Sequence, residues 1–392
     1  MKKITIILTV LIAMTITSNA QWQQTNCPYT GRINCFSISG INIFAGTQND
    51  GIYLSTDDGA NWTLVNTGLT NNCVRALAIS GTNIFAATAG SGVFLSTDNG
   101  SNWATLNNGL TNLDVRAFLA NSPYLNAGTN GGGDFGSSDN GANWSSVNTG
   151  LTDLHVTALG MVGYTAFAGT PSGVFILNYP TWSAVNNGLT NLDVYTLATS
   201  GTTLFAGTQG GGIFKTSDNG ANWFTANTGL TFSYVTSFAV SGTNIFAGTN
   251  GGGVFLSTNS GANWTAINTG LTTLDIYSLA ISGTYIYAGT DASGVWKRPL
   301  SEVTGINEII DNNNISVYPN PFCTQTTLQT DKIFKDATLT IYNSFGQQVK
   351  QIKNISGQTI TFHRDNLPSG LYFIQLTQDS KVITSDKLVI TD

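Results

Sequence analysis

Apolar and polar positions repeat in a fixed order through residues 21–300. In one repeat, an apolar segment at 115–120 is followed by a second at 124–128, a third near Phe135, and a fourth at 144–147 that begins with tryptophan. Each segment is short, rich in apolar residues, and bounded by Gly, Asn or Ser, which is typical of β-strands separated by tight turns. The pattern predicts four antiparallel strands in every repeat.

The repeat has a period of about 41 residues and occurs seven times. A tryptophan marks its fourth strand, at positions 22, 62, 103, 144, 182, 223 and 264. A second landmark, Phe-Ala-Gly-Thr or a close variant, begins at positions 44, 85, 125, 167, 205, 246 and 287. Four short strands repeated at this period are the signature of a β-propeller.

The two ends of the repeat region predict how the ring closes. The seventh unit has three strand segments, near 276–281, 285–288 and 294–296, and then lacks a fourth. Residues 22–25 match the tryptophan-led fourth strand of the other units. An N-terminal strand that completes the last blade removes two exposed sheet edges. We therefore expect an all-β chain whose residues 21–300 form a seven-bladed propeller closed by an N-terminal strand.

The turn before each tryptophan has the pattern Ser-x-Asp-x-Gly-x-Asn-Trp, with Thr for Ser in one copy and Asn for the first Asp in another. Asp or Asn oxygens accept backbone N–H groups within a turn, glycine takes a positive φ, and tryptophan anchors the turn to the core. The motif resembles the Asp box (BNR repeat) of sialidase-like and sortilin-like propellers, which implies a structural role. The residues concerned are Asp57, Trp62, Asp98, Trp103, Asp139, Trp144, Asp218, Trp223, Asn259 and Trp264. In the fourth unit a shorter segment, 177–182, replaces the box but keeps its tryptophan.

The character of the chain changes after residue 300. Residues 301–314, with an Asp-Asn-Asn-Asn run, are typical of a linker. Alternating segments at 326–329, 337–342, 359–362, 371–377 and 387–390 predict a small Ig-like β-sandwich over 315–392.

This C-terminal region resembles the sorting domain of the type IX secretion system. The resemblance rests on a Tyr-Pro-Asn-Pro segment, a glycine after the central strand, and a Leu-x-x-Gly-x-Tyr segment. The matching residues are Tyr318, Pro319, Asn320, Pro321, Gly346, Gly370 and Tyr372. The resemblance implies a Bacteroidetes-type source and export through the type IX machinery, followed by release or attachment at the cell surface. The alternative is an Ig-like adhesive module that stays on the chain.

The N-terminus and the composition also bear on location and partners. Residues 1–20 combine two lysines, a short apolar run and a small-residue end, which is typical of a signal peptide cleaved before Gln21. No later stretch predicts a transmembrane segment in the mature chain. Charged residues make up 9% and the net charge is −6, which disfavours nucleic acid as a partner. We expect a monomer that reaches the exterior through the periplasm.

Four cysteines without a CxxC pair, and only two histidines, give no metal-site pattern, and we expect neither metal nor cofactor. In an exported protein Cys27 and Cys35 could form a disulfide. Cys35 also falls in a small-residue column of the repeat, with Ala76, Ala117 and Ala158, so a buried thiol is the other interpretation.

The face opposite the Asp boxes is where we expect a ligand. Residues at the starts of the inner strands differ from blade to blade and could surround the central channel. The entry positions are Cys73, Asp114, His155, Asp193, Tyr234 and Asp275, and two positions further on come Arg75, Arg116, Thr157, Tyr195, Thr236 and Tyr277. From these columns, the candidate ligand-binding residues are Arg75, Asp114, Arg116, His155, Asp193, Tyr234 and Asp275. The alternative is that they are solvated loop ends.

Two functions fit such a face. The first is a secreted or surface-displayed, non-enzymatic scaffold that binds an extracellular glycan or protein. The alternative is an extracellular glycoside hydrolase that uses carboxylates such as Asp114, Asp193 and Asp275. A sialidase mechanism is disfavoured, because residues 21–300 contain no glutamate to pair with a tyrosine nucleophile.

Overall fold

The structure is a computed structural model that describes residues 21–303 except 122, and residues 315–392 except 344–347 and 379–380. The predicted signal peptide, most of the predicted linker and Gly346 lie outside the described residues. The chain divides into two compact units, Met1–Ile306 and Asn307–Asp392. Each unit is treated by itself.

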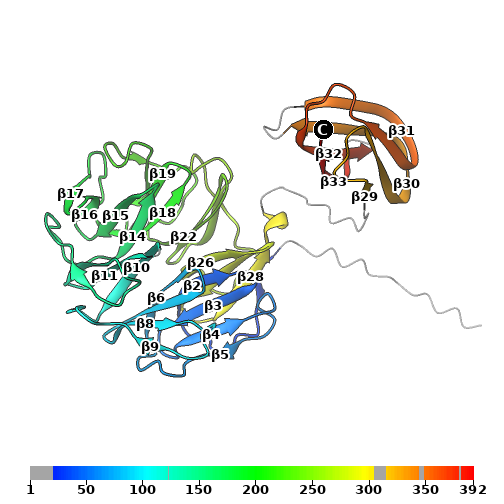
Figure 1. Cartoon of the computed structure of the whole chain (residues 1–392). Helices are drawn as coiled ribbons and strands as arrows, with labels where there is room; N and C mark the ends of the chain where they lie inside the picture. The colour runs from blue at the N-terminus through cyan, green and yellow to red at the C-terminus, as the bar shows by residue number, and fades with distance from the viewer. Residues whose placement is uncertain (1–20, 122, 304–314, 344–347, 379–380) are drawn as a thin grey trace, which may run out of the picture. The chain divides into compact units, whose positions relative to one another are not determined.

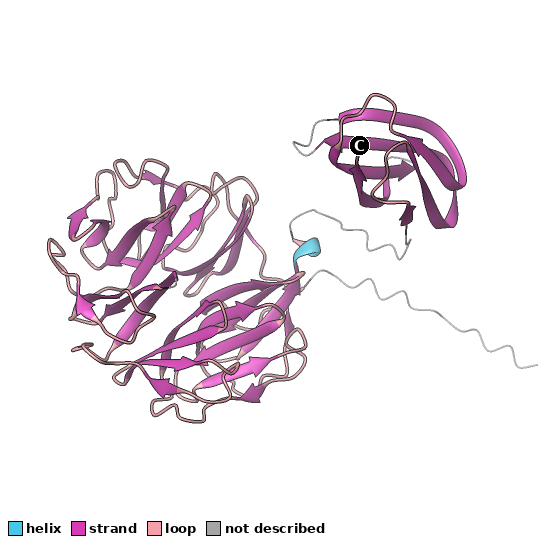
Figure 2. Ribbon diagram, in the orientation of Figure 1, coloured by secondary structure: helices cyan, strands magenta, loops and turns pink. Residues whose placement is uncertain are grey.

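The first unit is built from seven four-stranded antiparallel sheets, arranged as blades around a centre (Figures 1 and 2). The strands of blades one to three are β2 (Ile33–Ser39), β3 (Asn42–Thr47), β4 (Ile52–Ser55), β5 (Thr63–Leu64), β6 (Val74–Ser80), β7 (Asn83–Thr88), β8 (Gly92–Ser96), β9 (Ala104–Thr105), β10 (Val115–Asn121), β11 (Tyr124–Thr129), β12 (Gly133–Ser137) and β13 (Ser145–Ser146). Those of blades four to six are β14 (Ala158–Val162), β15 (Thr165–Thr170), β16 (Gly173–Asn178), β17 (Thr181–Ala184), β18 (Val194–Ser200), β19 (Thr203–Thr208), β20 (Gly212–Thr216), β21 (Phe224–Thr225), β22 (Val235–Ser241), β23 (Asn244–Thr249), β24 (Gly253–Ser257) and β25 (Thr265–Ala266).

The seventh blade joins the two ends of the propeller. It contains β26 (Ile276–Ser282), β27 (Tyr285–Thr290), β28 (Val295–Pro299) and β1 (Gln23–Gln24). Strand β1 pairs with β28, so that Gln23 lies opposite Lys297. Trp22, only 2% exposed, donates its Nε1–H to the carbonyl of Ile267 at 2.7 Å. The predicted seven-bladed fold with N-terminal closure is confirmed. A short 3₁₀ helix, η1 (Leu300–Glu302), follows β28.

Buried aromatic rings hold neighbouring blades together. The second strand of most blades carries a fully buried ring that packs against the next blade, as Phe44 does against a cluster that contains Val74 and Trp103. The rings in this column are Phe44, Phe85, Phe167, Phe205, Phe246 and Tyr287. Burying such a ring contributes about 1.5–3 kcal/mol. The third blade has Asn126 at this position.

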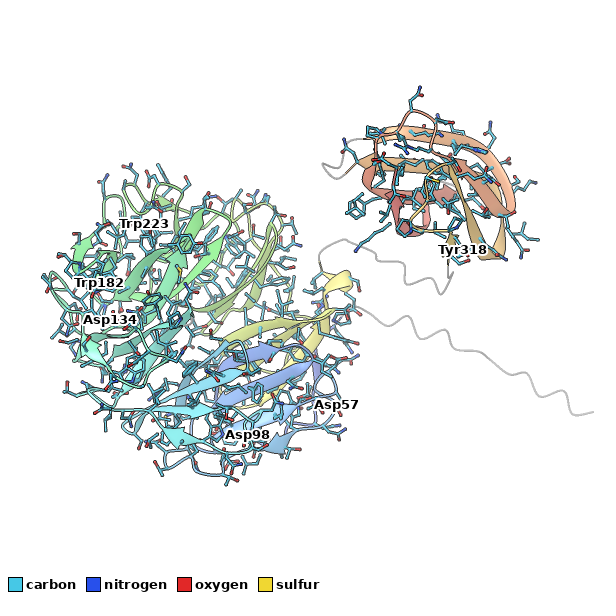
Figure 3. The ribbon with its side chains drawn as sticks, viewed as in Figure 1. Asp57, Asp98, Asp134, Trp182, Trp223 and Tyr318 are labelled. Carbon is cyan, nitrogen blue, oxygen red and sulfur yellow. The ribbon has the colours of Figure 1, made fainter. Side chains whose placement is uncertain are left out.

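The Ser-x-Asp-x-Gly-x-Asn-Trp turns, called Asp-box turns here after the motif that they resemble, connect the third and fourth strands, and the second copy shows their geometry. Asp98 accepts the backbone N–H of Asn102 at 2.9 Å and its side-chain amide at 2.8 Å. Ser96 Oγ donates to Asp98 at 2.8 Å and accepts the N–H of Gly100, whose φ is +82°. The Asn102 amide and the other donors lower the pKa of Asp98. The carboxylate therefore serves to close the turn; Asp98 is labelled in Figure 3.

In four of the five box turns the tryptophan donates its indole N–H to the preceding blade; the exception is Trp62, whose Nε1 has no hydrogen-bond partner among the described residues. Trp103 donates its indole N–H to Val65 of the preceding blade at 2.8 Å, and its backbone N–H to Thr67. The fourth strands begin only after this residue, at Ala104 in the second blade, which is one residue later than the pattern predicts. The fourth blade lacks the box, yet Trp182 keeps the same indole bond, to Val147 at 2.7 Å.

The second unit is a bent, sandwich-like sheet with the strand order β29-β30-β32-β33, and β31 pairs with β30. Its strands are β29 (Ile315–Tyr318), β30 (Gln325–Asn343), β31 (Gln348–His363), β32 (Gly370–Gln378) and β33 (Lys381–Ile390). The segments predicted at 326–329 and 337–342 are one long strand, because β30 continues through several register shifts instead of ending in a turn. Its core contains Leu328, Leu339, Phe362 and Ile374.

Candidate functional site

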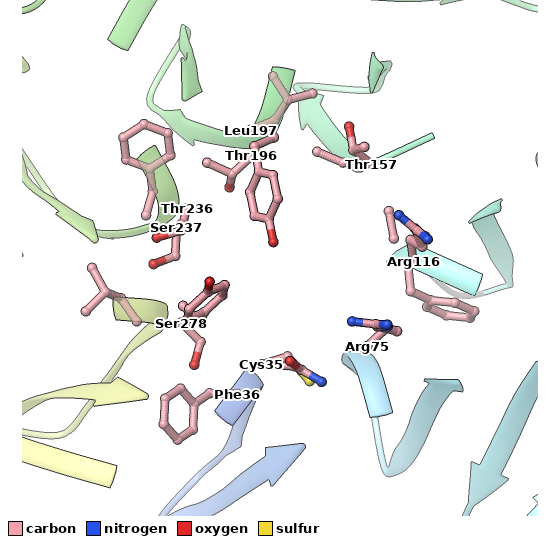
Figure 4. A pocket seen from close by; sticks show the side chains of 18 of the residues that line it. Cys35, Phe36, Arg75, Arg116, Thr157, Thr196, Leu197, Thr236, Ser237 and Ser278 are labelled. Carbon is pink, nitrogen blue, oxygen red and sulfur yellow. The ribbon is translucent and has the colours of Figure 1, made fainter. Parts of the chain in front are cut away.

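The channel pocket is a cavity of about 320 Å³ lined by inner-strand residues from all seven blades (Figure 4). It lies at the starts of the inner strands. Because successive strands in a blade are antiparallel, the Asp-box turns lie at the other end of the sheets. The polar side chains that line it are Arg32, Asn34, Cys35, Arg75, Arg116, Thr157, Tyr195, Thr196, Thr236, Ser237, Tyr277 and Ser278.

Three of these side chains are already occupied in joining blades. Asn34 donates its amide to the carbonyl of Val74 at 2.8 Å. Thr157 bonds the carbonyl of Val194 at 2.6 Å, and Thr236 bonds that of Ile276 at 2.5 Å. Each acceptor belongs to the next blade. These hydroxyl and amide groups are therefore structural, and the arginines and tyrosines are the largest polar side chains that remain for recognition, beside the smaller Cys35, Thr196 and Ser237.

Arg32 is held on the first blade by a partner from the seventh. Its Nε lies 2.5 Å from Asp291 Oδ1, and its guanidinium carbon lies 3.8 Å from the centre of the Tyr277 ring. The Tyr277 hydroxyl accepts the side-chain amide of Asn250 at 3.2 Å. Arg32 is therefore fixed in place, with its charge balanced by a carboxylate.

Arg116 also has a carboxylate nearby. Its Nη2 lies 3.4 Å from Asp114 Oδ2, which accepts the amide of Asn130 at 2.9 Å as well. The Arg116 side chain is 40% exposed, so this ion pair is weak and open to exchange with an incoming anion. Asp114 thus acts on Arg116 from outside the pocket lining.

Arg75 is the arginine with spare hydrogen-bonding capacity. Its Nη1 donates to the neutral side chain of Gln48 at 3.2 Å. Its Nε is buried and has no hydrogen-bond partner among the described residues. No carboxylate of the described chain forms an ion pair with it. A buried donor without a partner costs about 1–3 kcal/mol.

The sequence-predicted site residues fall into two groups. Arg75 and Arg116 line the pocket, whereas the others lie at the junctions between blades, outside its lining. Four of them form isolated bridges to the loop of the preceding blade: Asp114, His155, Tyr234 and Asp275. The fifth is Asp193, whose carboxyl pKa is raised by burial.

Two of these junction residues interact with neighbours rather than with the cavity. His155 Nδ1 lies 3.0 Å from Asp153, whose other carboxylate oxygen accepts the Ser172 hydroxyl at 2.8 Å. Tyr234 packs edge-on against Tyr195, with ring centres 5.4 Å apart. Burial raises the pKa of Tyr234 to about 12, so its phenol is neutral at physiological pH.

Tyr195 and Tyr277 belong to the column that the repeat predicts at the channel rim, although they were not among the candidate ligand-binding residues, whereas Arg32 and Asn34 were not predicted at all. Arg32 occupies in the first blade the position that Cys73 and Asp114 occupy in the next two, at the same repeat spacing. This repeat spacing is the signal that could have identified Arg32 from the sequence. Which of two alternate positions faces the channel depends on the pleat and on a bulge at each inner strand, for example between Val115 and Ala117.

The cysteines of the structure are all free thiols. Cys27 and Cys35 are both unbonded, so the free-thiol interpretation describes Cys35. Desolvation by the surrounding core raises the pKa of Cys27 to about 11 and that of Cys35 to about 12. No cluster of metal-ligating side chains is found in the described ranges. Within those ranges, no helix has the length and apolar character to cross a bilayer.

Comparison with solved structures identifies the fold of the first unit. PorZ, a bacterial surface component of the type IX secretion system of Porphyromonas gingivalis, matches with a TM-score of 0.59 at 16% identity, over 92% of this chain and 60% of PorZ. The extracellular domain of a hybrid two-component system protein of B. thetaiotaomicron matches with a TM-score of 0.61 at 13% identity, over 95% of this chain and 57% of its own. YCF48, solved with a D1 peptide, matches with a TM-score of 0.57 at 16% identity, over 72% of this chain and 96% of its own. This chain therefore spans about 60% of the PorZ chain.

Comparison of the sequence assigns the C-terminal unit. No curated protein matches the chain. Residues 316–391 match the family described as the secretion system C-terminal sorting domain. The motif residues stabilise this domain: Asn320 donates to the carbonyl of Lys387 and accepts the N–H of Val389, both at 2.8 Å, and the hydroxyl of the buried Tyr372 bonds Pro368. The chain is thus a β-propeller that carries a secretion-system sorting domain and is secreted or attached to the outer cell surface.

Proposed function

We propose that the propeller is a non-enzymatic binding module of the cell exterior, and that its channel pocket captures an acidic group of an extracellular glycan or protein. The group is a carboxylate or a sulfate. Arg75 carries the proposal, since its charge has no carboxylate partner in the described chain and its Nε has no acceptor.

The rest of the pocket supports anion binding. Arg116 lies on the neighbouring blade and is loosely paired, so it could join Arg75 in a two-armed clamp on one carboxylate. Figure 4 shows both arginines extending into the cavity from adjacent blades. Tyr195 and Tyr277, from the fifth and seventh blades, supply aromatic faces and hydroxyls suited to a sugar ring or a peptide.

The arrangement of the carboxylates favours binding over hydrolysis. A glycosidase needs two carboxyl groups on either side of the bond it cleaves. Asp114 is engaged by Arg116 and Asn130, and the described lining of the pocket contains arginine, tyrosine, threonine and asparagine rather than acids. The pocket therefore offers side chains that can bind an acidic ligand. Its described lining contains no pair of carboxyl groups that could catalyse hydrolysis.

The test is a binding screen on the purified full chain. Arrays would carry uronate-bearing and sulfated glycans, neutral glycans of the same backbones, and peptides with free or amidated C-termini. We expect the chain to bind the acidic probes of one class, either the glycans or the peptides, and we expect Arg75→Gln to lose that binding. Lys215→Gln is the matched control, because it removes one positive charge from a surface strand away from the channel.

Chromogenic glycosides assayed beside the arrays address hydrolysis. Turnover that disappears in Asp114→Asn, Asp193→Asn or Asp275→Asn would overturn the non-enzymatic proposal. Equal binding of neutral and acidic probes, or equal losses in Arg75→Gln and Lys215→Gln, would overturn the assignment of the pocket.

A further inference from the structure

A second cavity lies between the third and fourth blades, at the Asp-box end of the sheets. Its volume is about 580 Å³, which is within the range of ligand sites. Its walls come from β10, β11 and β12 on one side and from β14, β15 and β16 on the other. We call it the blade 3–4 cleft. It is distinct from the channel pocket and independent of the function proposed above.

The cleft exists because an aromatic ring is missing. In the other blades, the second strand supplies a buried ring to the next blade, and its cross-strand partner is often leucine, as in the pair Phe44–Leu54. In the third blade the corresponding pair is Asn126–Gly136. Both replacements remove apolar volume from the same seam.

The partner of that ring is missing as well. In the first seam, Phe44 lies so close to the Asp-box glycine Gly100 of the next blade that a β-carbon there would be 3.2 Å from it. The fourth blade has no Asp box, and the short turn through Tyr179 takes its place. Ring and box are thus lost together across a single seam, and the cavity is the space that they would fill.

Behind the lining of the cleft, the third blade is polar where the other blades are apolar; Asn126 lines the cleft, and Asp134 lies outside the lining. Asn126 donates its amide to Asp134 Oδ2 at 2.7 Å, and Asp134 is 0% exposed. The equivalent positions hold valine or isoleucine, such as Val93 and Val254. The second oxygen of Asp134, Oδ1, has no hydrogen-bond partner among the described residues. Figure 3 marks Asp134 beside the blade that carries Trp182.

The mouth of the cleft is aromatic and uncharged. Tyr124, Tyr164 and Tyr179 stand at its edge with exposed fractions of 63%, 97% and 82%. The inner walls are largely aliphatic and include Leu125 and Met161. None of the lining residues carries a charge. These surroundings suit a flat, neutral ligand and disfavour an ion.

We propose that the blade 3–4 cleft binds an aromatic ring that carries a hydroxyl group, a phenol, supplied by a small molecule or by a tyrosine side chain of a partner polypeptide. The ring occupies the volume that Phe44 and its equivalents fill in other seams. The hydroxyl donates to the side-chain oxygen of Asn126, which lines the cleft and receives no hydrogen bond from the described residues. The three exposed tyrosines close over the bound ring.

The test measures binding of p-cresol and toluene to the full chain by ligand-observed NMR and calorimetry. We expect p-cresol to bind about tenfold more tightly than toluene, which is the value of one hydrogen bond. Asn126→Phe restores the missing ring and should abolish binding of both. Asn244→Phe, the same exchange on the sixth blade, whose seam keeps Phe246, should leave binding unchanged.

A second variant keeps the test decisive if the filled cleft disturbs folding. Asn126→Leu removes the acceptor but leaves room for a ring, so p-cresol and toluene should then bind equally. Peptides Gly-Tyr-Gly and Gly-Phe-Gly separate the two sources: preference for the tyrosine peptide over free p-cresol indicates a polypeptide partner, and the reverse indicates a small molecule. Binding that survives Asn126→Phe in a folded protein, or equal affinity of the wild type for p-cresol and toluene, would overturn the proposal.

Discussion

At the scale of single residues, polar side chains in this propeller either satisfy the backbone or keep unused hydrogen-bonding capacity. Asp98 belongs to the first kind, because both its oxygens accept bonds inside one turn. Arg75 and Asp134 belong to the second, because each has a buried polar atom without a partner among the described residues. Such atoms mark places where a ligand or a proton changes the energetics most.

Two substitutions of Asp98 distinguish its role as a hydrogen-bond acceptor in the turn from any role of its negative charge. Asp98→Ala removes the acceptor for Asn102 and should lower the free energy of unfolding. Asp98→Asn should preserve most of it, since Asn259 occupies the equivalent place in the sixth blade and accepts the N–H of Asn263 at 3.0 Å. Urea denaturation of the two variants beside the wild type makes the comparison. Equal destabilisation by alanine and asparagine would contradict the turn-forming role.

The burial of Asp134 should make the free energy of unfolding depend on pH in an unusual direction. Burial raises its pKa to about 7, so the folded state holds a proton that the unfolded state releases near pH 4. A raised pKa of this kind makes the free energy of unfolding fall as the pH rises from about 4 to 7, by up to roughly 4 kcal/mol. Asp134→Val, which copies Val93, should stabilise the protein at pH 7 and remove this dependence.

The check on Asp134 is a series of urea denaturation curves between pH 4 and pH 8. The matched control is Asp218→Asn. Hydrogen bonds from Thr216 and Asn222 hold the pKa of Asp218 at about 2, so its charge does not change over this interval. A flat profile in the wild type would show that folding does not raise the pKa of Asp134, and a slope that persists in Asp134→Val would show that another group causes the pH dependence.

At the scale of the element, the repeated turns and strands follow from local sequence, whereas the blade seams depend on which residues face each other. Trp22 shows the value of one seam residue. It is 2% exposed and bonds Ile267 across the junction between the sixth and seventh blades. The N-terminal strand would otherwise contribute only the two residues of β1.

Trp22→Ala should therefore weaken closure of the ring. Truncation of a buried tryptophan costs about 3–5 kcal/mol. Gln23→Ala, at an exposed position of the same strand, should cost little. Hydrogen exchange of β28 and the urea midpoint report the two effects. Rapid exchange confined to β28 and β1 is the expected pattern, and an unchanged midpoint in Trp22→Ala would mean that β1 does not hold the ring closed.

The seven blades and their closure could be predicted because each copy repeats the same apolar positions and the same tryptophan. The site could be predicted only in part. Arg75, Arg116, Tyr195 and Tyr277 stand in one visible column of the repeat. The sequence does not reveal that this column, rather than the one that contains Asp114, lines the channel, because the inward direction depends on the pleat and on a bulge in each inner strand. Asn126, Asp134 and Gly136 are visible departures from the repeat, yet only the fold shows that they face one seam.

At the scale of the whole molecule, the chain separates export from recognition. The sorting domain of residues 316–391 directs the chain out of the cell, and it forms a compact unit with its own core. The propeller presents two faces of different chemistry, with arginine and tyrosine at the channel pocket and neutral aromatic residues at the blade 3–4 cleft. A ring of similar blades can thus carry a site wherever a few residues depart from the repeat.

The central claim is that recognition takes place at the channel pocket while the Asp-box turns act as scaffold. The most direct test is the dissociation constant of the full chain for the strongest acidic array probe, measured in the wild type, Arg75→Gln and Asp98→Asn. We expect Arg75→Gln to weaken binding about 10- to 100-fold, as loss of a charged hydrogen bond should, and Asp98→Asn to leave it unchanged. Loss of binding in Asp98→Asn with full binding in Arg75→Gln would contradict the account.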